Sequence, residues 1–294
     1  MRPPYPVAIP PLLPQFLNKR RSKLTYALTK AEELGIDRPA LVWVVNLSYR
    51  GERGGAAEPG DLDSAYATIR ERWLPMAAVA RGAGLVEERG GRWRVTAKGK
   101  AVAKDLHDAA RAHYETLAPI AEKDLAELAQ LLDAAFVAAS RAKEPARRMH
   151  TPFAFAYRAD GVRPGSFAQL DAAVYGLWQV RDDCHMAAWT DAAMSGPELE
   201  ILTRAWRAEA ADEAALAELL PHQTADDVHA SLDRLRHDGL VEGAAIRTTE
   251  KGRRVRQRIE DETDRLFFSP WPDPVGAKGD WIARMLSEVN AALT

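Results

Sequence analysis

One block of residues occurs twice in this chain, and it limits the possible folds more than any other feature. Residues 84–87 read Gly-Leu-Val-Glu and, after a short spacer, residues 96–100 read Thr-Ala-Lys-Gly-Lys. Residues 239–242 repeat Gly-Leu-Val-Glu, and residues 249–253 read Thr-Glu-Lys-Gly-Arg after a spacer that is two residues shorter. Similar residue types in the same order predict the same unit of structure at both places.

The residue types of this block, called the Gly-Thr block below, predict its local structure. Gly84 and Gly239 are expected to end a helix, because glycine adopts the left-handed conformation at a helix C-terminus without steric cost. The Leu-Val pair begins a strand, and in the first copy this strand turns at residues 90–91, a Gly-Gly hairpin signal. Thr96 and Thr249 can cap the helix that follows. A helix, a hairpin and a helix in this order predict a winged helix.

Further helices are expected before each hairpin. In the second copy, Ser195–Glu198 and Thr224–Asp227 carry helix-start signals, and residues 211–220 form a helix between them. The first copy is less regular. Its expected elements are a helix from Pro39 through Leu47, a glycine-rich loop over 50–60, a helix over 61–73, and a helix of about two turns after Pro75. Residues 12–34 predict one more helix.

The predicted fold class is mainly α with small β wings, in which tandem winged-helix domains are bridged by a helical middle segment. A length of 294 residues is enough for two domains. The expected bounds are an N-terminal arm and helix over 1–34, a first winged-helix domain over 35–118, a helical linker segment over 119–194, and a second winged-helix domain with C-terminal helices over 195–294.

The composition of the chain limits the expected class of protein, its cellular compartment and its cofactors. Its hydrophobic content of 47% with 28% charged residues is typical of a globular protein. Cys184 is the single cysteine, so neither an intramolecular disulfide nor a cysteine-based zinc site can form. The longest apolar run, residues 40–45, is too short to cross a bilayer, and the N-terminus lacks a secretory signal. We therefore expect a cytoplasmic protein without cofactor, metal or membrane partner, as a monomer or homodimer.

The chain as a whole is slightly acidic, with a net charge of −2, but basic residues are concentrated around the two blocks. Basic patches beside a winged helix favour double-stranded DNA as partner, with the wing at the phosphates and the preceding helix in the major groove. The candidate DNA-binding residues are Arg89, Arg92, Arg94, Lys98, His229, Ser231, Arg234, Arg247, Lys251, Arg253 and Arg254. Asp226 and Asp227 argue against this interpretation, because they would repel phosphate at the start of the second recognition helix.

The predicted helix over residues 167–194 carries charge inside an apolar stripe. Arg181 and His185 share a face with Leu170, Val174 and Leu177, while Asp183 is expected to point away. A buried charge needs a partner, so one interpretation is a structural ion pair of Arg181 with Asp182. The other is a pocket for a small anionic or aromatic ligand, lined by Trp178, Arg181, Asp182, His185 and Trp189. One histidine and two carboxylates do not make a metal site.

The Gly-Leu-Val and Thr-x-Lys-Gly-Arg pattern resembles the wing of MarR-type winged-helix regulators. From about residue 168 to the C-terminus, the chain also resembles an uncharacterised bacterial winged-helix family. In that family an Arg-x-Asp-x-His helix, matched here by residues 181–185, precedes the winged unit, and the last helix is similar to residues 259–264, which lead to Pro270-Trp271. The resemblance implies a regulator-like fold and supplies no biochemical activity.

A ligand-responsive, DNA-binding transcriptional regulator of MarR-like type is the leading hypothesis for function. The alternative is a small-molecule-binding protein, such as an enzyme, a DNA-repair protein or a resistance factor, that uses the winged helices as scaffold. The sequence contains no phosphate-binding glycine loop, nucleophile elbow or His-Glu-x-x-His motif, so catalysis is the less favoured alternative.

Overall fold

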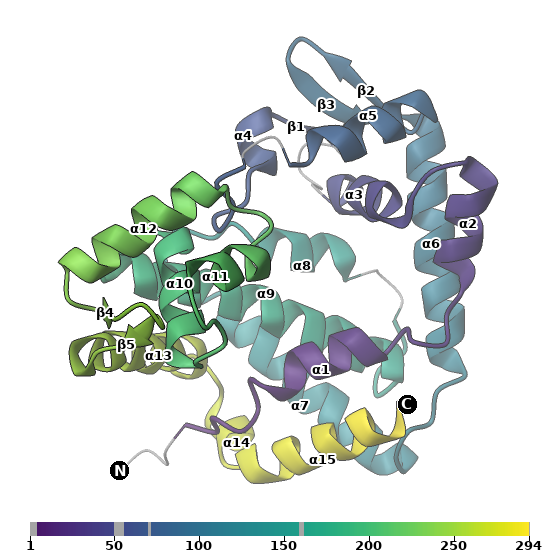
Figure 1. Cartoon of the computed structure of the whole chain (residues 1–294). Helices are drawn as coiled ribbons and strands as arrows, with labels where there is room; N and C mark the ends of the chain where they lie inside the picture. The colour runs from purple at the N-terminus through teal and green to yellow at the C-terminus, as the bar shows by residue number, and fades with distance from the viewer. Residues whose placement is uncertain (1–4, 50–55, 70–71, 159–161, 294) are drawn as a thin grey trace. The chain divides into compact units, whose positions relative to one another are not determined.

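The computed structural model describes residues 5–49, 56–69, 72–158 and 162–293, and these residues are mainly helical with two small antiparallel sheets (Figure 1). This confirms the predicted class, mainly α with small β wings. The elements are α1 (Leu12–Lys19), α2 (Tyr26–Leu34), α3 (Arg38–Ser48), β1 (Ala56–Ala57), α4 (Pro59–Leu62), α5 (Leu74–Gly82), β2 (Val86–Arg89), β3 (Arg92–Val95), α6 (Ala97–Glu115), α7 (Glu122–Ser140), α8 (Thr151–Tyr157), α9 (Phe167–Asp191), α10 (Gly196–Trp206), α11 (Glu213–Leu219), α12 (Ala225–His237), β4 (Val241–Glu242), β5 (Arg247–Thr248), α13 (Glu250–Phe268), α14 (Asp273–Gly276) and α15 (Gly279–Ala292).

Contacts divide the chain into two compact units. The first unit comprises residues 1–61, 74–183 and 264–294, and the second comprises residues 62–73 and 184–263. Each of the long helices α9 and α13 contributes residues to both units. The four-part division predicted from the sequence stays a prediction. No helix in the described ranges is both long enough and apolar enough to span a membrane.

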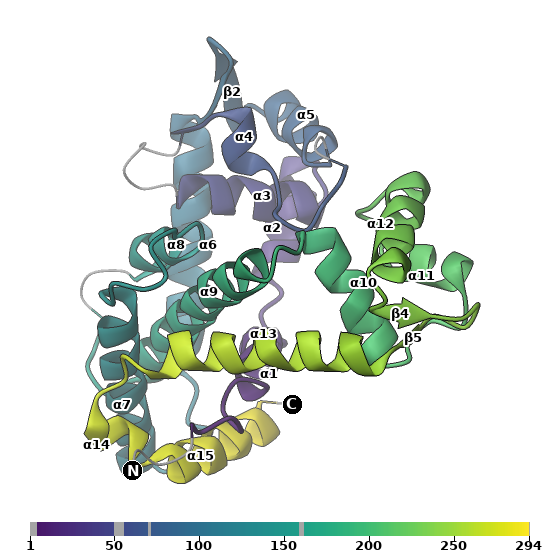
Figure 2. The ribbon, with the colours of Figure 1, turned by 90° about the vertical axis from the view of Figure 1, so that its left-hand side faces the viewer.

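The second unit is built on helices with strong N-terminal caps. Ser195 begins α10 with a complete capping box, in which its hydroxyl accepts from the amide of Glu198 and its own amide donates to the Glu198 carboxylate. Thr224 caps α12 by accepting from the amide of Asp227. The apolar faces of α10 and α12 pack against each other, and β4 pairs with β5 in the register Val241 to Thr248 (Figure 2).

In the first unit the corresponding hairpin is longer. Strands β2 and β3 are joined by Gly90 and Gly91, whose φ angles of +57° and +73° form the kind of turn that favours glycine. Strand β1 lies in the segment that was predicted to be a loop. It pairs with β3 and extends the hairpin to a three-stranded sheet. Trp93 of β3 is buried edge-on against Trp43 of α3, which fixes the sheet to its own helices.

Two expected helices are not formed as predicted. The helix predicted over residues 12–34 is interrupted between α1 and α2, and this break contains Arg20 and Arg21, whose side chains turn into a buried polar cluster described below. The helix predicted over residues 61–73 is wrong beyond Leu62. The described residues that follow, 63–69 and 72–73, form turns and irregular chain within the second unit, where the Ala65 carbonyl lies against Gly196 and the Ile69 amide donates to the His222 carbonyl. Part of the loop predicted over residues 50–60 lies outside the described residues.

Candidate functional site

The first copy of the Gly-Thr block is held together by its threonine. The Thr96 amide donates to the Leu85 carbonyl at 3.0 Å, and the Thr96 hydroxyl donates to the Gly84 carbonyl at 2.7 Å. The same hydroxyl accepts from the Gly99 amide at 3.1 Å, which caps α6. Thr96 therefore joins the end of one helix, the start of a strand and the start of the next helix.

The second copy repeats these contacts. The Thr249 amide donates to the Leu240 carbonyl at 3.0 Å, and its hydroxyl donates to the Gly239 carbonyl at 2.6 Å while accepting from the Gly252 amide at 3.0 Å. The preceding glycines also match, with φ angles of +73° at Gly84 and +65° at Gly239. The two hairpins predicted from the sequence are confirmed, and both are closed by the same set of hydrogen bonds.

The glycine in the first helical turn has a steric reason in both copies. A Cβ atom on Gly99 would lie 2.1 Å from the carbonyl oxygen of Leu85, and one on Gly252 would lie 2.0 Å from that of Leu240. Only glycine lets the helix approach the strand this closely. The resemblance to a wing motif therefore reflects how the chain packs at these points.

The lysine of each block also has an internal contact. Lys98 Nζ donates to the Ala83 carbonyl at 2.8 Å, and Lys251 Nζ donates to the Asp238 carbonyl at 2.6 Å. Both carbonyls lie at the C-terminal end of a helix, where a cation is favourable. Lys98 and Lys251 remain exposed, and their predicted role in DNA binding stays a prediction.

The arginines of the first wing differ in their surroundings. Arg89 lies 3.5 Å from Glu87 and Arg92 lies 3.7 Å from Glu58, and both pairs face solvent. Arg94 is exposed on β3 and forms no ion pair within the described part of the chain. Exposed pairs of this kind contribute about 0–1 kcal/mol, so they do not bar a phosphate from these side chains.

The basic residues of the second wing are also exposed. Arg253 donates to the Thr248 carbonyl at 3.0 Å, and Arg254 forms an ion pair with Glu250 at 2.5 Å. Arg247 extends from β5. Neither Arg247 nor Arg253 pairs with a carboxylate of the described residues.

Helix α12, the predicted recognition helix, presents its cations already bound to carboxylates. His229 lies 2.7 Å from Glu213, and this contact, together with Asp233, raises the pKa of the imidazole. Arg234 Nε lies 2.6 Å from Glu198. The prediction that Ser231 reads base edges is wrong, because its side chain faces the core and its residue is only 2% exposed.

The predicted anchors of helix α9 both contact α13. Arg181 Nη2 lies 3.4 Å from Asp264 Oδ1, and His185 Nδ1 lies 3.0 Å from Thr263 Oγ1. The expectation that Asp182 is the ion-pair partner of Arg181 is therefore wrong: a residue one position away on the same helix points in another direction. Burial and the neighbouring Asp183 raise the pKa of Asp182.

Asp183 does not point away from the protein, as the helical spacing suggested. It is fully buried, and its carboxylate accepts from the amides of Met149, His150 and Thr151 at 2.8–2.9 Å and from the Thr151 hydroxyl at 2.7 Å. Burial alone would raise the pKa of Asp183, but these bonds and the His150 imidazole outweigh it and lower the pKa. Asp183 thus holds the start of α8.

The two tryptophans that were predicted to wall a ligand pocket are placed differently. Trp189 is buried and packs against Tyr66 with ring centroids 6.1 Å apart, while Trp178 is half-buried. A ligand pocket at Trp178, Arg181, Asp182, His185 and Trp189 stays a prediction.

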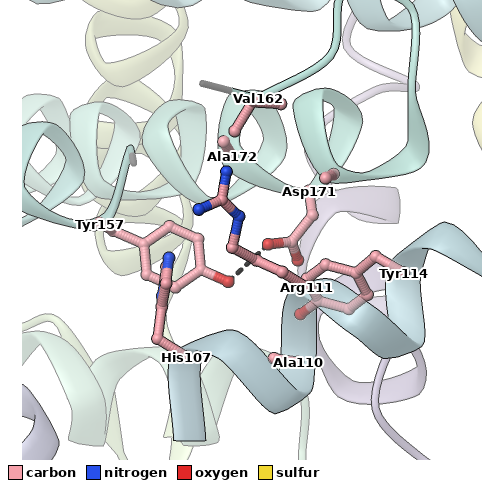
Figure 3. A pocket seen from close by; sticks show the side chains of 9 residues that line it. His107, Ala110, Arg111, Tyr114, Tyr157, Val162, Asp171 and Ala172 are labelled. Atoms are coloured by element: carbon pink, nitrogen blue, oxygen red, sulfur yellow. Dashed lines mark hydrogen bonds between the residues drawn. The ribbon is translucent and has the colours of Figure 1, made fainter. Parts of the chain in front are cut away.

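A pocket in the first unit lies nearer the start of α9. Figure 3 shows its polar lining: His107, Arg111 and Tyr114 come from α6, Tyr157 from α8 and Asp171 from α9. The remaining walls are small and apolar: Ala110, Val162, Ala168 and Ala172. In this conformation the hollow has room for about one water molecule.

Behind this pocket lies a buried cluster of arginines and tyrosines. Arg20 Nε is 2.5 Å from Asp171 Oδ1, and Arg21 donates to the hydroxyls of Tyr114 and Tyr157, each at 2.6 Å. The Tyr157 hydroxyl in turn donates to Asp171 Oδ2 at 2.5 Å. These residues could not be predicted from the sequence, because they come from four separate segments and no motif connects them.

Comparison with known proteins identifies the family. No curated protein and no solved structure matches the chain. The model of a helix-turn-helix family matches residues 83–294, a range that includes both copies of the Gly-Thr block and helices α9 to α13. Such a family supports a DNA-binding regulator in general terms. Because the match covers well over half of its length, the chain belongs to this helix-turn-helix family.

Proposed function

We propose that the protein is a DNA-binding transcriptional regulator of MarR-like winged-helix type, with two winged units in tandem. The observation that carries this proposal is the repeated hairpin: the same threonine, glycine and lysine contacts close a wing after α5 and again after α12. Family membership supports DNA as the partner in general terms. The MarR-like type is the more specific part of our proposal and goes beyond what family membership supports.

In the proposed complex, α12 enters the major groove and the wing cations contact phosphates. Arg247, Arg253 and Arg254 are the leading phosphate contacts of the second wing, and Arg94 is that of the first. His229 and Arg234 would exchange Glu213 and Glu198 for DNA. For His229 that exchange is inexpensive, because its pair with Glu213 is exposed and such pairs contribute about 0–1 kcal/mol. The exchange costs more for Arg234, because its partner Glu198 is largely buried.

Fluorescence anisotropy with a labelled duplex, selected from fragments of the source genome, tests the proposal. Binding should weaken steeply with salt. The double variants R92E/R94E and R253E/R254E should each reduce affinity and lower the salt dependence. The matched control is R284E, which reverses an exposed arginine on α15, a helix that is part of neither wing. Tight binding that is unchanged in both double variants would refute the wing-centred mechanism.

The second candidate function is a small-molecule-binding protein that uses the winged helices as scaffold. One observation favours it: the cations of α12 are bound to carboxylates, and Asp226 and Asp227 begin that helix. Under this alternative the protein shows no salt-sensitive binding to any duplex from the genomic pool. The same anisotropy experiment therefore separates the two functions.

A further inference from the structure

We propose that helix α5 reads the 5-methyl groups of thymine in the major groove of double-stranded DNA. This readout rests on the proposed function, to which it adds the chemical group that the first copy of the winged helix recognises. Helix α5 precedes the β2–β3 hairpin as α12 precedes the β4–β5 hairpin. It therefore has the position of the recognition helix in the first copy.

The exposed face of α5 has no side chain that can form a hydrogen bond. Helix α5 packs on α3, and its residues Ala77 and Ala80 are buried. The residues of the opposite face are exposed and lie at helical spacing: Pro75, Ala78, Val79 and Gly82. None of these residues has a polar side-chain atom, so this face cannot read base edges through side-chain hydrogen bonds.

The one charged residue of α5 lies at the flank of this face and contacts the wing. Arg81 Nη1 is 3.8 Å from Glu88 Oε2, and the Arg81 guanidinium lies 5.9 Å from the centroid of the Trp93 ring. Glu88 belongs to β2 and Trp93 to β3. The middle of the exposed face is therefore uncharged and apolar.

Thymine methyl groups are the feature of the major groove that such a face can recognise. Thymine presents its C5-methyl group there, and apolar side chains such as alanine contact it. Small residues also let the helix approach the bases closely, and even a Cβ added to Gly82 would meet no atom within 4 Å. Val79 has the largest side chain of the face and is 39% exposed, which makes it the leading methyl contact.

Size and charge favour DNA over a protein partner at this face. A stable protein interface buries about 800 Å² on each partner and is centred on large apolar side chains, whereas this face offers one valine among smaller residues. Helix α5 contains no acidic residue, in contrast to α12, which begins with Asp226 and Asp227. Residues 84–104, which form the adjoining wing and the start of α6, contain six basic residues and two acidic ones. This excess of positive charge suits the phosphates that border the groove.

A paired exchange in the DNA and in the protein tests this inference. The duplex selected for the anisotropy experiment is compared with the same duplex in which deoxyuridine replaces thymidine, an exchange that removes the 5-methyl groups and keeps the hydrogen-bonding pattern. The wild-type protein should bind the uracil duplex at least about fourfold more weakly, which corresponds to one buried methyl group. Val79→Ala should reduce this preference for thymine by about two- to fourfold, because the γ-methyl groups that contact thymine are lost.

Val42→Ala is the matched control. Val42 is a similarly exposed valine on the neighbouring helix α3, at 44%, so neither substitution removes core packing. Val42→Ala should keep the full preference for thymine, and the second-wing variant R253E/R254E should weaken binding to both duplexes while the preference persists. Absence of binding to any duplex would overturn the proposed function and this readout together. Binding without a preference for thymine, or a preference that Val79→Ala reduces no more than Val42→Ala does, would overturn this readout alone.

Discussion

Gly252 provides the sharpest test of how the wings are built. Alanine normally stabilises a helix relative to glycine by about 1 kcal/mol. At Gly252 the added Cβ would lie 2.0 Å from the Leu240 carbonyl oxygen, a distance at which the backbone must shift by about 1 Å. Because a carbonyl cannot rotate away as a flexible side chain can, we expect Gly252→Ala to destabilise the protein.

The magnitude follows from two opposing effects. Overpacking costs about 1–3 kcal/mol, and contact with rigid backbone places Gly252 at the upper end of that range. The gain in helix propensity offsets about 1 kcal/mol. The net loss is about 2 kcal/mol, which lowers Tm by roughly 8–16 °C for a unit of the size of the second unit.

Thermal unfolding followed by circular dichroism measures this loss, and Gly82→Ala is the matched control. Gly82 is also helical, but a Cβ there meets no atom within 4 Å, so alanine should raise stability by about 0.5–1 kcal/mol. Gly99→Ala should behave like Gly252→Ala, since its Cβ would lie 2.1 Å from the Leu85 oxygen. A Gly252→Ala protein as stable as the wild type would refute the steric explanation of the block.

Three further expectations follow from the hydrogen bonds. Thr249→Ala should lower the free energy of unfolding by about 1 kcal/mol, whereas Thr249→Ser, which keeps the hydroxyl, should lose much less in the same urea titration. The pKa of Asp183 is lowered in the folded state, so the stabilisation from its carboxylate is present above the ordinary aspartate pKa of about 3.9 and is lost as pH falls through the folded value. Asp183→Asn should therefore destabilise the protein at pH 7. The variant should also lose less stability than the wild type between pH 7 and acid, as measured by urea titrations at each pH. Arg181→Leu should destabilise the wild-type protein more than it destabilises the Asp264→Leu variant, because Arg181 and Asp264 form an ion pair. A double-mutant cycle measures this difference, and equal effects in the two backgrounds would show that the pair does not interact.

The features that could be predicted from the sequence are those specified by neighbouring residues. The helix end at Gly84, the turn at residues 90–91 and the cap at Thr96 depend on backbone conformation over a few positions, and all were predicted. Strand β1 was missed, because a two-residue strand has no periodicity to detect and forms only when β3 is available to pair with it.

Partners distant in sequence were the main source of error. Helical spacing placed Arg181 and Asp183 on faces relative to an assumed core, but it could not show that Asp264 lies beside Arg181 or that the amides of residues 149–151 lie over Asp183. The polar cluster is the extreme case. Arg20 and Asp171 lie more than a hundred positions apart in the chain, and each alone looks like an ordinary charged surface residue.

The two copies of the block also show which residues are available to contact DNA. The threonine, the glycine and the lysine are each occupied by contacts within the protein, so a chain could keep this motif for packing alone. Any DNA contact must therefore come mainly from exposed positions without such a contact among the described residues, such as Arg94 and Arg247. Substitution at Thr249 or Gly252 tests folding, whereas substitution at Arg94 or Arg247 tests recognition. Loss of DNA binding in a block variant would consequently mean little unless an exposed arginine variant that folds normally loses binding as well.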